Sequence, residues 1–255
     1  MLFGRGSSAR KLESIPVGHY HDVMLTGHPV RRAWHQLKFT RVLELLPQAP
    51  GQSILDIGCF AGTFLSLVDE ARFTRQVGVD ILPEQVAYAQ AHFGSAHRQF
   101  VHVAHVSEIS SAIEGTFDCI TLIEVIEHLS PAEIDATLQQ AARKLRPGGR
   151  LVMSTPNYAS AWPLLEVALN QLSDVTYDEQ HITRFTWFDC ERKLAEISPT
   201  LHESFELELK TTTHLVSPFL AVLGVDFASR ISSAVTHRGW KMPFGNLVML
   251  SWLKR

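Results

Sequence analysis

Two carboxylates and two imidazoles are the side chains of this chain best suited to acid–base or metal chemistry. Glu124, Glu127 and His128 stand within one short segment directly after an apolar run typical of a buried strand, and His181 follows later. Residues three and four apart share a face if the segment turns into a helix, so these side chains could converge. They could then hold a divalent metal ion, or His128 could act alone as a general base. A surface ion pair without chemistry is the structural alternative.

A second informative segment runs from Ile54 to Gly62. Its sequence is an apolar strand that ends in Asp56 and continues into a turn with two spaced glycines. Turns of this kind bring the backbone close to a nucleotide-like ligand at the start of a helix, and we expect Thr63 to cap that helix. The next short strand ends in Asp80, at the distance where α/β nucleotide sites place a carboxylate that binds a ribose diol.

These segments together resemble the cofactor half of class I S-adenosylmethionine-dependent methyltransferases. The resemblance rests on Leu55-Asp-Ile-Gly-Cys-Phe-Ala-Gly62 and Val77-Gly-Val-Asp80. Downstream, Leu145-Arg-Pro-Gly-Gly-Arg-Leu-Val152 is similar to the turn that precedes the fifth strand of this family. The resemblance implies S-adenosyl-L-methionine as the cofactor and an enzyme that transfers its methyl group.

The resemblance also implies a role for individual residues. Asp80 is expected to bind the ribose hydroxyls and Ile81 to press on the adenine, while the glycines leave room for the ligand. Phe60 stands where the family usually has glycine, and phenylalanine is tolerated there only if the position does not need a positive φ, because a β-carbon disfavours the left-handed region. The remaining expected cofactor contacts are Asp56, Gly58, Cys59, Phe60, Gly62 and Glu124.

An oxygen acceptor must lose a proton before or during methyl transfer, which requires a general base or a metal. We therefore expect catalysis from Glu124, Glu127, His128 and His181, either as four ligands of a divalent ion or with His128 as the base. This pattern is similar to ubiquinone-pathway and other bacterial O-methyltransferases. It is also similar to the metal-dependent enzymes that methylate the 2′-hydroxyl at the 3′ end of small RNAs.

The charge of the chain favours a small-molecule, glycan or lipid-like acceptor over nucleic acid. The net charge is -3 and no arginine-rich stretch interleaves with aromatic residues. Two apolar runs, 162–172 and 215–227, are expected to form the acceptor pocket or a lid; they are too short to span a bilayer, but peripheral membrane contact is compatible with them. Core packing or a dimer surface is the alternative for both runs. A non-catalytic cofactor-binding module remains the competing functional class.

Strands that alternate with helices predict an α/β fold with a single Rossmann-like domain. We expect a mostly parallel seven-stranded sheet, helices on both faces and an antiparallel C-terminal hairpin. The expected parts are a tail over 1–28, a helical segment over 29–50, a cofactor-binding core over 51–158, acceptor-side helices with an apolar lid over 159–245, and a last strand over 246–255. Three widely separated cysteines, Cys59, Cys119 and Cys190, and the lack of a signal-like apolar core in 1–11 predict a cytoplasmic protein with reduced thiols.

Overall fold

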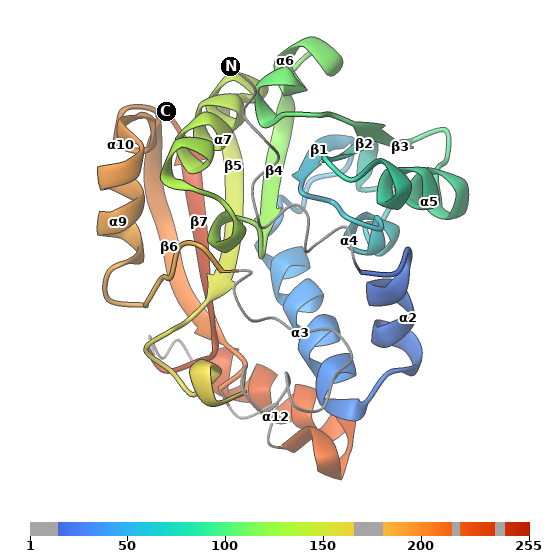
Figure 1. Ribbon diagram of the computed structural model, residues 1–255, viewed down its shortest axis with the longest axis vertical. Helices are drawn as coiled ribbons and strands as arrows, with labels where there is room; N and C mark the ends of the chain where they lie inside the picture. Colours follow the sequence, from blue (N-terminus) through green and yellow to red (C-terminus); the bar gives the residue numbers. More distant parts are fainter. Residues whose placement is uncertain (1–14, 166–180, 216–219, 238–242) are drawn as a thin grey trace.

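A seven-stranded sheet in the order β3-β2-β1-β4-β5-β7-β6 organises the molecule (Figure 1). The computed structural model describes residues 15–165, 181–215, 220–237 and 243–255. The parallel strands are β1 (Gln52–Ile57), β2 (Phe73–Asp80), β3 (Arg98–His102), β4 (Phe117–Ile123) and β5 (Leu145–Pro156). An antiparallel pair, β6 (Phe205–Thr213) and β7 (Leu247–Lys254), extends the sheet beyond β5. The predicted α/β class, the mostly parallel sheet and the antiparallel C-terminal strands are confirmed.

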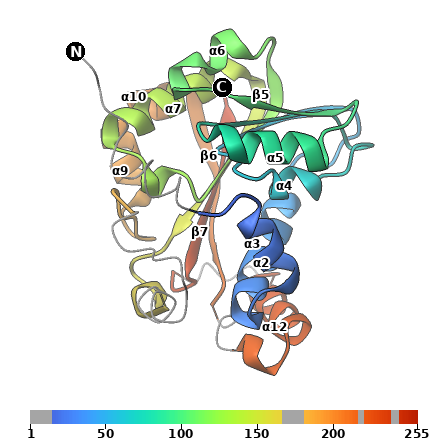
Figure 2. The same cartoon turned by 45° about the vertical axis from the view of Figure 1, so that its right-hand side comes forward.

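Helices cover both faces of the sheet, which explains why the central strands are continuous apolar runs. One core contains side chains of α6 (Ile109–Ala112), α7 (Pro131–Lys144), α9 (Cys190–Ile197) and α10 (Pro199–Ser204). The opposite core contains side chains of α2 (His19–Thr26), α3 (Pro29–Leu45), α4 (Thr63–Ser66) and α5 (Pro83–Phe93). Figure 2 shows α2 and α3 side by side, below α4 and α5.

Apolar residues three and four apart, such as Ile134, Leu138 and Ala141, predict a helix over 131–145. This helix is observed as α7, and its ends follow from local chemistry. Ser130 and Glu133 form a capping box, and Pro131 occupies the first turn, where its missing N–H costs nothing. Ile134, Leu138 and Ala141 are fully buried on one face. This helix brings the segment before it, which includes Glu127 and His128, to the carboxyl end of β4.

The expected N-terminal tail is wrong for the part of it that the structure describes. Residues 15–28 contain α2, Ile15 is buried, and Gln85 binds both the Gly18 amide (3.2 Å) and the Ile15 carbonyl (3.3 Å). Residues 1–14 lie outside the described ranges. Contacts with α5, which lies far along the sequence, hold this segment in place. No local sequence pattern predicts those contacts.

Other boundaries also differ from expectation. Thr63 is the first residue of α4 rather than its cap, and α4 ends at Ser66, which leaves Leu67 exposed. The third strand ends at His102, and η1 (Val106–Glu108) follows it.

The apolar run 162–172 is described only to 165, and 216–219 of the second run also fall outside the described ranges. The rest of the second run contains η3 (Ala221–Leu223) and leads into α12 (Val225–His237), which lies within the range expected to hold acceptor-side helices. Among the described helices, none has the length and apolar character needed to cross a membrane.

Candidate active site

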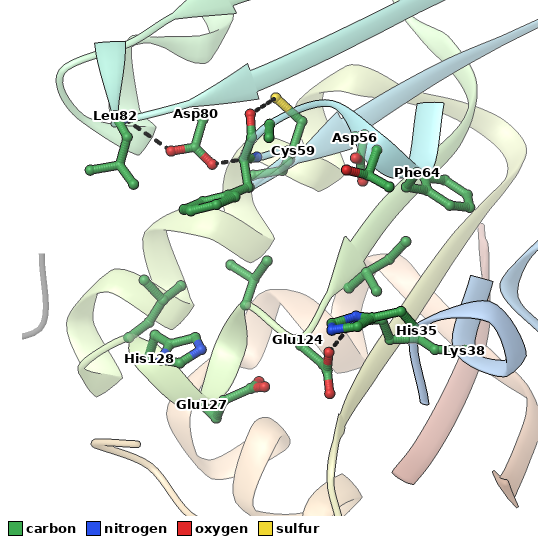
Figure 3. Close-up of a pocket in the computed structure, with 18 of the residues that line it drawn as sticks. His35, Lys38, Asp56, Cys59, Phe64, Asp80, Leu82, Glu124, Glu127 and His128 are labelled. Carbon is green, nitrogen blue, oxygen red and sulfur yellow. Dashed lines mark hydrogen bonds and ion pairs between the residues drawn. The ribbon is translucent and has the colours of Figure 1, made fainter. Parts of the chain in front are cut away.

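A cavity of about 280 Å³ lies where the carboxyl ends of β1, β2 and β4 face α3. This is the edge of an open α/β sheet at which ligands bind. Figure 3 shows Asp80, Cys59 and Asp56 on one wall of the cavity and Glu124, Glu127 and His128 on the opposite wall. The predicted site residues that line it are Asp56, Gly58, Cys59, Phe60, Asp80, Ile81, Glu124, Glu127, His128 and His181.

Asp80 shapes the turn that follows β1. Its carboxylate accepts hydrogen bonds from the backbone amides of Phe60 (2.8 Å) and Leu82 (3.0 Å), and burial raises its pKa. Phe60 has a φ of 48°, so the position has a positive φ in spite of the β-carbon. The hydrogen bond to Asp80 fixes the Phe60 amide in this orientation and offsets the strain of a β-carbon in the left-handed region. Each carboxylate oxygen retains a second lone pair that a ribose hydroxyl could use.

The two glycines of the turn serve the packing of the protein itself. A β-carbon on Gly58, where φ is 79°, would lie 2.5 Å from Val125 Cγ2, and one on Gly62, where φ is 75°, would lie 2.7 Å from Phe100. Gly62 is not among the residues that line the cavity, so its expected contact with the cofactor stays a prediction. Asp56, fully buried below the turn, accepts a hydrogen bond from Thr121 Oγ1 (2.6 Å), and burial raises its pKa to about 7.

Glu124 turns toward α3 rather than toward Glu127. Its carboxylate forms an ion pair with Lys38 and accepts a hydrogen bond from Trp34 Nε1 (3.2 Å). Burial alone would raise the pKa of Glu124, but the Lys38 ammonium outweighs it and holds this pKa at about 2. Its backbone is in the left-handed region, with a φ of 53°. The expected four-ligand metal set is therefore not brought together.

Glu127, His128 and His181 do converge. Each offers a ligand atom, and these atoms lie within 4.8 Å of one another. Glu127 and His128 belong to η2 (Ile126–His128), and the amides of Ile182 (2.8 Å) and Thr183 (3.1 Å) donate to the Glu127 carbonyl, which fixes the His181 loop beside it. The Tyr158 hydroxyl lies 2.6 Å from His181 Nδ1.

The Glu127 carboxylate is 1% exposed and lacks a hydrogen-bond partner of normal geometry among the described residues. Burial raises its pKa to about 7, against the opposing effect of the nearby His181. A buried carboxylate without a partner is costly, and a proton or a cation would relieve that cost. Together with the two imidazoles it forms a donor set that fits a divalent ion with three protein ligands.

Sequence reasoning missed the contribution of α3 to the cavity. Trp34, His35 and Lys38 line it, although Trp34 and His35 carried no signal beyond packing. The centroid of the Trp34 ring lies 4.8 Å from that of the Trp162 ring. The backbone carbonyl of Trp34 forms a hydrogen bond with Nε2 of the buried His214 (2.9 Å). The one available signal was Lys38 itself, a charged residue within the apolar stripe of a helix.

Comparison with known proteins identifies the family. Residues 30–197, more than half of the chain, match a family model described as a methyltransferase domain. The ubiquinone biosynthesis O-methyltransferase of Xanthomonas oryzae pv. oryzae is 34% identical over 113 residues, which cover 44% of this chain and 46% of that protein. The chain thus spans less than half the length of the curated relatives that it matches first.

Solved structures of low sequence identity share the fold. The N-methyltransferase NodS from Bradyrhizobium japonicum WM9, in complex with S-adenosyl-l-homocysteine, is 15% identical with a TM-score of 0.59, over 97% of this chain and 96% of that one. PH0226 from Pyrococcus horikoshii OT3 is 17% identical with a TM-score of 0.60, over 99% and 100% of the two chains. The fold, the cofactor motifs and the family match agree: the chain belongs to the S-adenosylmethionine-dependent methyltransferase family.

Proposed function

We propose that the chain transfers the methyl group of S-adenosylmethionine to a hydroxyl oxygen of a small-molecule, glycan or lipid-like acceptor. The observation that carries this proposal is the convergence of Glu127, His128 and His181 on the wall of the cavity opposite Asp80. In this reaction the S–CH₃ bond of the sulfonium breaks, an O–CH₃ bond forms, and the hydroxyl proton passes to the imidazole of His128. The products are a methyl ether and S-adenosylhomocysteine, with the proton held by His128.

The cavity supports binding of the cofactor along the β1–β2 wall. Asp80 offers a carboxylate for the ribose hydroxyls, and Ile81 beside it is 41% exposed and available to the adenine. Across the cavity, an ionised Glu127 would stabilise the imidazolium that forms at His128, and the Tyr158 hydroxyl orients His181. The protein mainly aligns the acceptor and excludes water, since the sulfonium already activates the methyl group.

The acceptor class is supported by the lining of the cavity and by the relatives. Val30, Trp34, Trp162 and Leu165 give the acceptor side an apolar surface. The relatives that are 34% identical are ubiquinone biosynthesis O-methyltransferases. Apolar burial contributes roughly 25 cal/mol per Å², so in a series of phenols that differ only in alkyl length affinity should rise with length until the pocket is full. A flat series would favour a polar acceptor instead.

A metal-assisted version of the same reaction is the second candidate, favoured by the unpartnered Glu127 carboxylate. Glu127, His128 and His181 would hold the ion, which would lower the pKa of the acceptor hydroxyl. Glu124 takes no part in this set, because it is paired with Lys38.

Release of S-adenosylhomocysteine tests both versions. Purified chain is incubated with S-adenosylmethionine and with phenols, sugars, lipid alcohols or a short RNA, with and without excess chelator. Turnover that survives chelation supports His128 as the base, and turnover that stops and returns with added Mg²⁺ or Mn²⁺ supports the ion. Methylation of RNA alone would replace the proposed acceptor class. No release with any acceptor, despite cofactor binding, would favour a non-catalytic module.

A further inference from the structure

Phe60 combines a strained backbone with a ring at the cavity. Its φ of 48° lies in the left-handed region, where a β-carbon is disfavoured and glycine is the usual residue. The side chain is half-buried and lines the cavity. A glycine at this position would relax the backbone but would lack the ring. Strain of this kind is kept where the side chain contributes to a site, so the ring itself needs an explanation.

The ring belongs to the wall of the cavity that is assigned to the ribose of the cofactor. The Phe60 amide donates to the Asp80 carboxylate (2.8 Å), which is the group expected to bind the ribose hydroxyls. Figure 3 shows Asp80 beside Cys59, the residue that precedes Phe60. In S-adenosylmethionine the sulfonium is bonded to C5′ of this same ribose. A ribose at Asp80 therefore brings a cation close to the Phe60 ring.

The other candidate partners of the sulfonium on this wall are already engaged. Phe64, the second aromatic residue of the β1–β2 wall, is 3% exposed, and its ring packs on that of Phe39 at 5.7 Å. The Asp56 carboxylate accepts a hydrogen bond from Thr121 (2.6 Å). An aromatic face attracts a cation through its quadrupole and offers no lone pair that could accept the methyl group. The half-buried Phe60 ring is thus the group best suited to face the sulfonium.

We propose that the Phe60 ring forms a cation–π contact with the sulfonium of S-adenosylmethionine and thereby raises the affinity for this cofactor relative to its product. Methyl transfer converts the sulfonium into the neutral thioether of S-adenosylhomocysteine, so the contact is lost with each turnover. The ring therefore favours exchange of product for fresh cofactor. The inference rests on the ribose assignment of Asp80 and is independent of the methyl acceptor.

Titration calorimetry of the full chain without an acceptor tests this proposal. Phe60→Leu keeps an apolar side chain and a β-carbon at the strained position but removes the ring. It should bind S-adenosylmethionine about three- to tenfold more weakly than wild type, and S-adenosylhomocysteine within about twofold. Phe60→Tyr keeps the ring and should resemble wild type with both ligands. Phe188→Leu is the matched control, since Phe188 is 66% exposed and is not among the residues that line this cavity.

A third ligand separates the charge from the methyl group. Sinefungin carries an ammonium in place of the methyl sulfonium, so Phe60→Leu should weaken its binding too. Weaker binding of S-adenosylmethionine with sinefungin unchanged would assign the ring to the methyl group and overturn the proposal. Equal losses for S-adenosylmethionine and S-adenosylhomocysteine, or no loss for either, would overturn it as well.

Two further variants keep the outcome decisive. Retained S-adenosylhomocysteine binding shows that Phe60→Leu is folded, and if it is not, Phe60→Gly allows the same comparison without a strained β-carbon. Asp80→Ala should weaken both ligands alike, because the ribose is common to them. A failure of the ribose assignment is therefore distinguished from a failure of the cation–π contact.

Discussion

The two walls of the cavity are built in different ways. The cofactor wall comes from one stretch of chain, in which backbone amides do the positioning: those of Phe60 and Leu82 donate to Asp80, and that of Gly58 donates to the Val79 carbonyl. The acceptor wall is assembled from segments far apart in sequence, and side chains hold it, as in the Lys38–Glu124 ion pair and the Tyr158–His181 hydrogen bond. Substitutions on the first wall should therefore alter cofactor affinity and folding, whereas those on the second should alter turnover.

The largest expected effect is on the acceptor wall. His128→Ala should lower kcat by about 10² to 10⁴-fold, because proton removal from the hydroxyl is lost, while S-adenosylmethionine affinity stays within about twofold. Initial rates and calorimetry measure the two quantities separately. His202→Ala, at an exposed histidine outside the cavity, is the control. Equal losses in kcat and in cofactor affinity would show that the two walls are not functionally separate.

Gly58→Ala should be the most destabilising change on the cofactor wall. The new β-carbon would combine a left-handed φ of 79° with a 2.5 Å contact to Val125, at a cost of about 2–4 kcal/mol in the free energy of unfolding. Gly148→Ala has a φ of 71° but open space, so it should cost only about 1–2 kcal/mol. Urea unfolding measures both. Adding Val125→Ala should recover part of the loss in Gly58→Ala, and no recovery would argue against the contact.

Asp80→Ala should weaken S-adenosylmethionine binding by about 1.5–3 kcal/mol, since a charge-assisted hydrogen bond to the ribose is lost. Titration calorimetry gives the affinity, and Glu84→Ala, at an exposed residue in the first turn of α5, is the matched control. An Asp80→Ala protein that stays folded and binds the cofactor within twofold of wild type would contradict the ribose assignment.

The smallest expected effect is a pH dependence of opposite sign at Asp56 of the cofactor wall and at His214, which lies behind Trp34 of the acceptor wall. Burial raises the pKa of Asp56 from 3.8 to about 7, so its contribution to stability is lost as pH rises through about 7. Burial lowers the pKa of His214, which packs on Trp34, from 6.5 to about 4, so its contribution is lost as pH falls from 6.5 through about 4. Asp56→Asn should flatten the alkaline fall and His214→Gln the acid fall, each by about 1–2 kcal/mol in urea unfolding across pH 4–8. The same slope in a variant as in wild type would rule out that group as its source.

Local sequence patterns predicted the elements that carry their own signals. The apolar run 117–123 predicts a buried strand and is observed as β4, and α7 follows its capping box and apolar spacing. The same patterns did not predict α2 and gave no bounds for α12, because contacts with α5 and α3 order those helices rather than their own periodicity. The positive φ of Phe60 could not be predicted for a related reason, since a hydrogen bond to Asp80 fixes it.

The sequence by itself determined the fold class and S-adenosylmethionine as the cofactor, because a strand, its turn and the next strand are contiguous and their chemistry is carried by the backbone. The cofactor contacts of individual residues on this wall stay predictions. Only the tertiary structure decided which side chains meet on the acceptor wall. It paired Glu124 with Lys38 instead of Glu127, and it brought His181 to His128 through the amides that bind the Glu127 carbonyl. The physical reason is that the type of a residue limits what its side chain can bind. Which of several possible buried partners it meets depends on how helices and loops that are distant in sequence pack together.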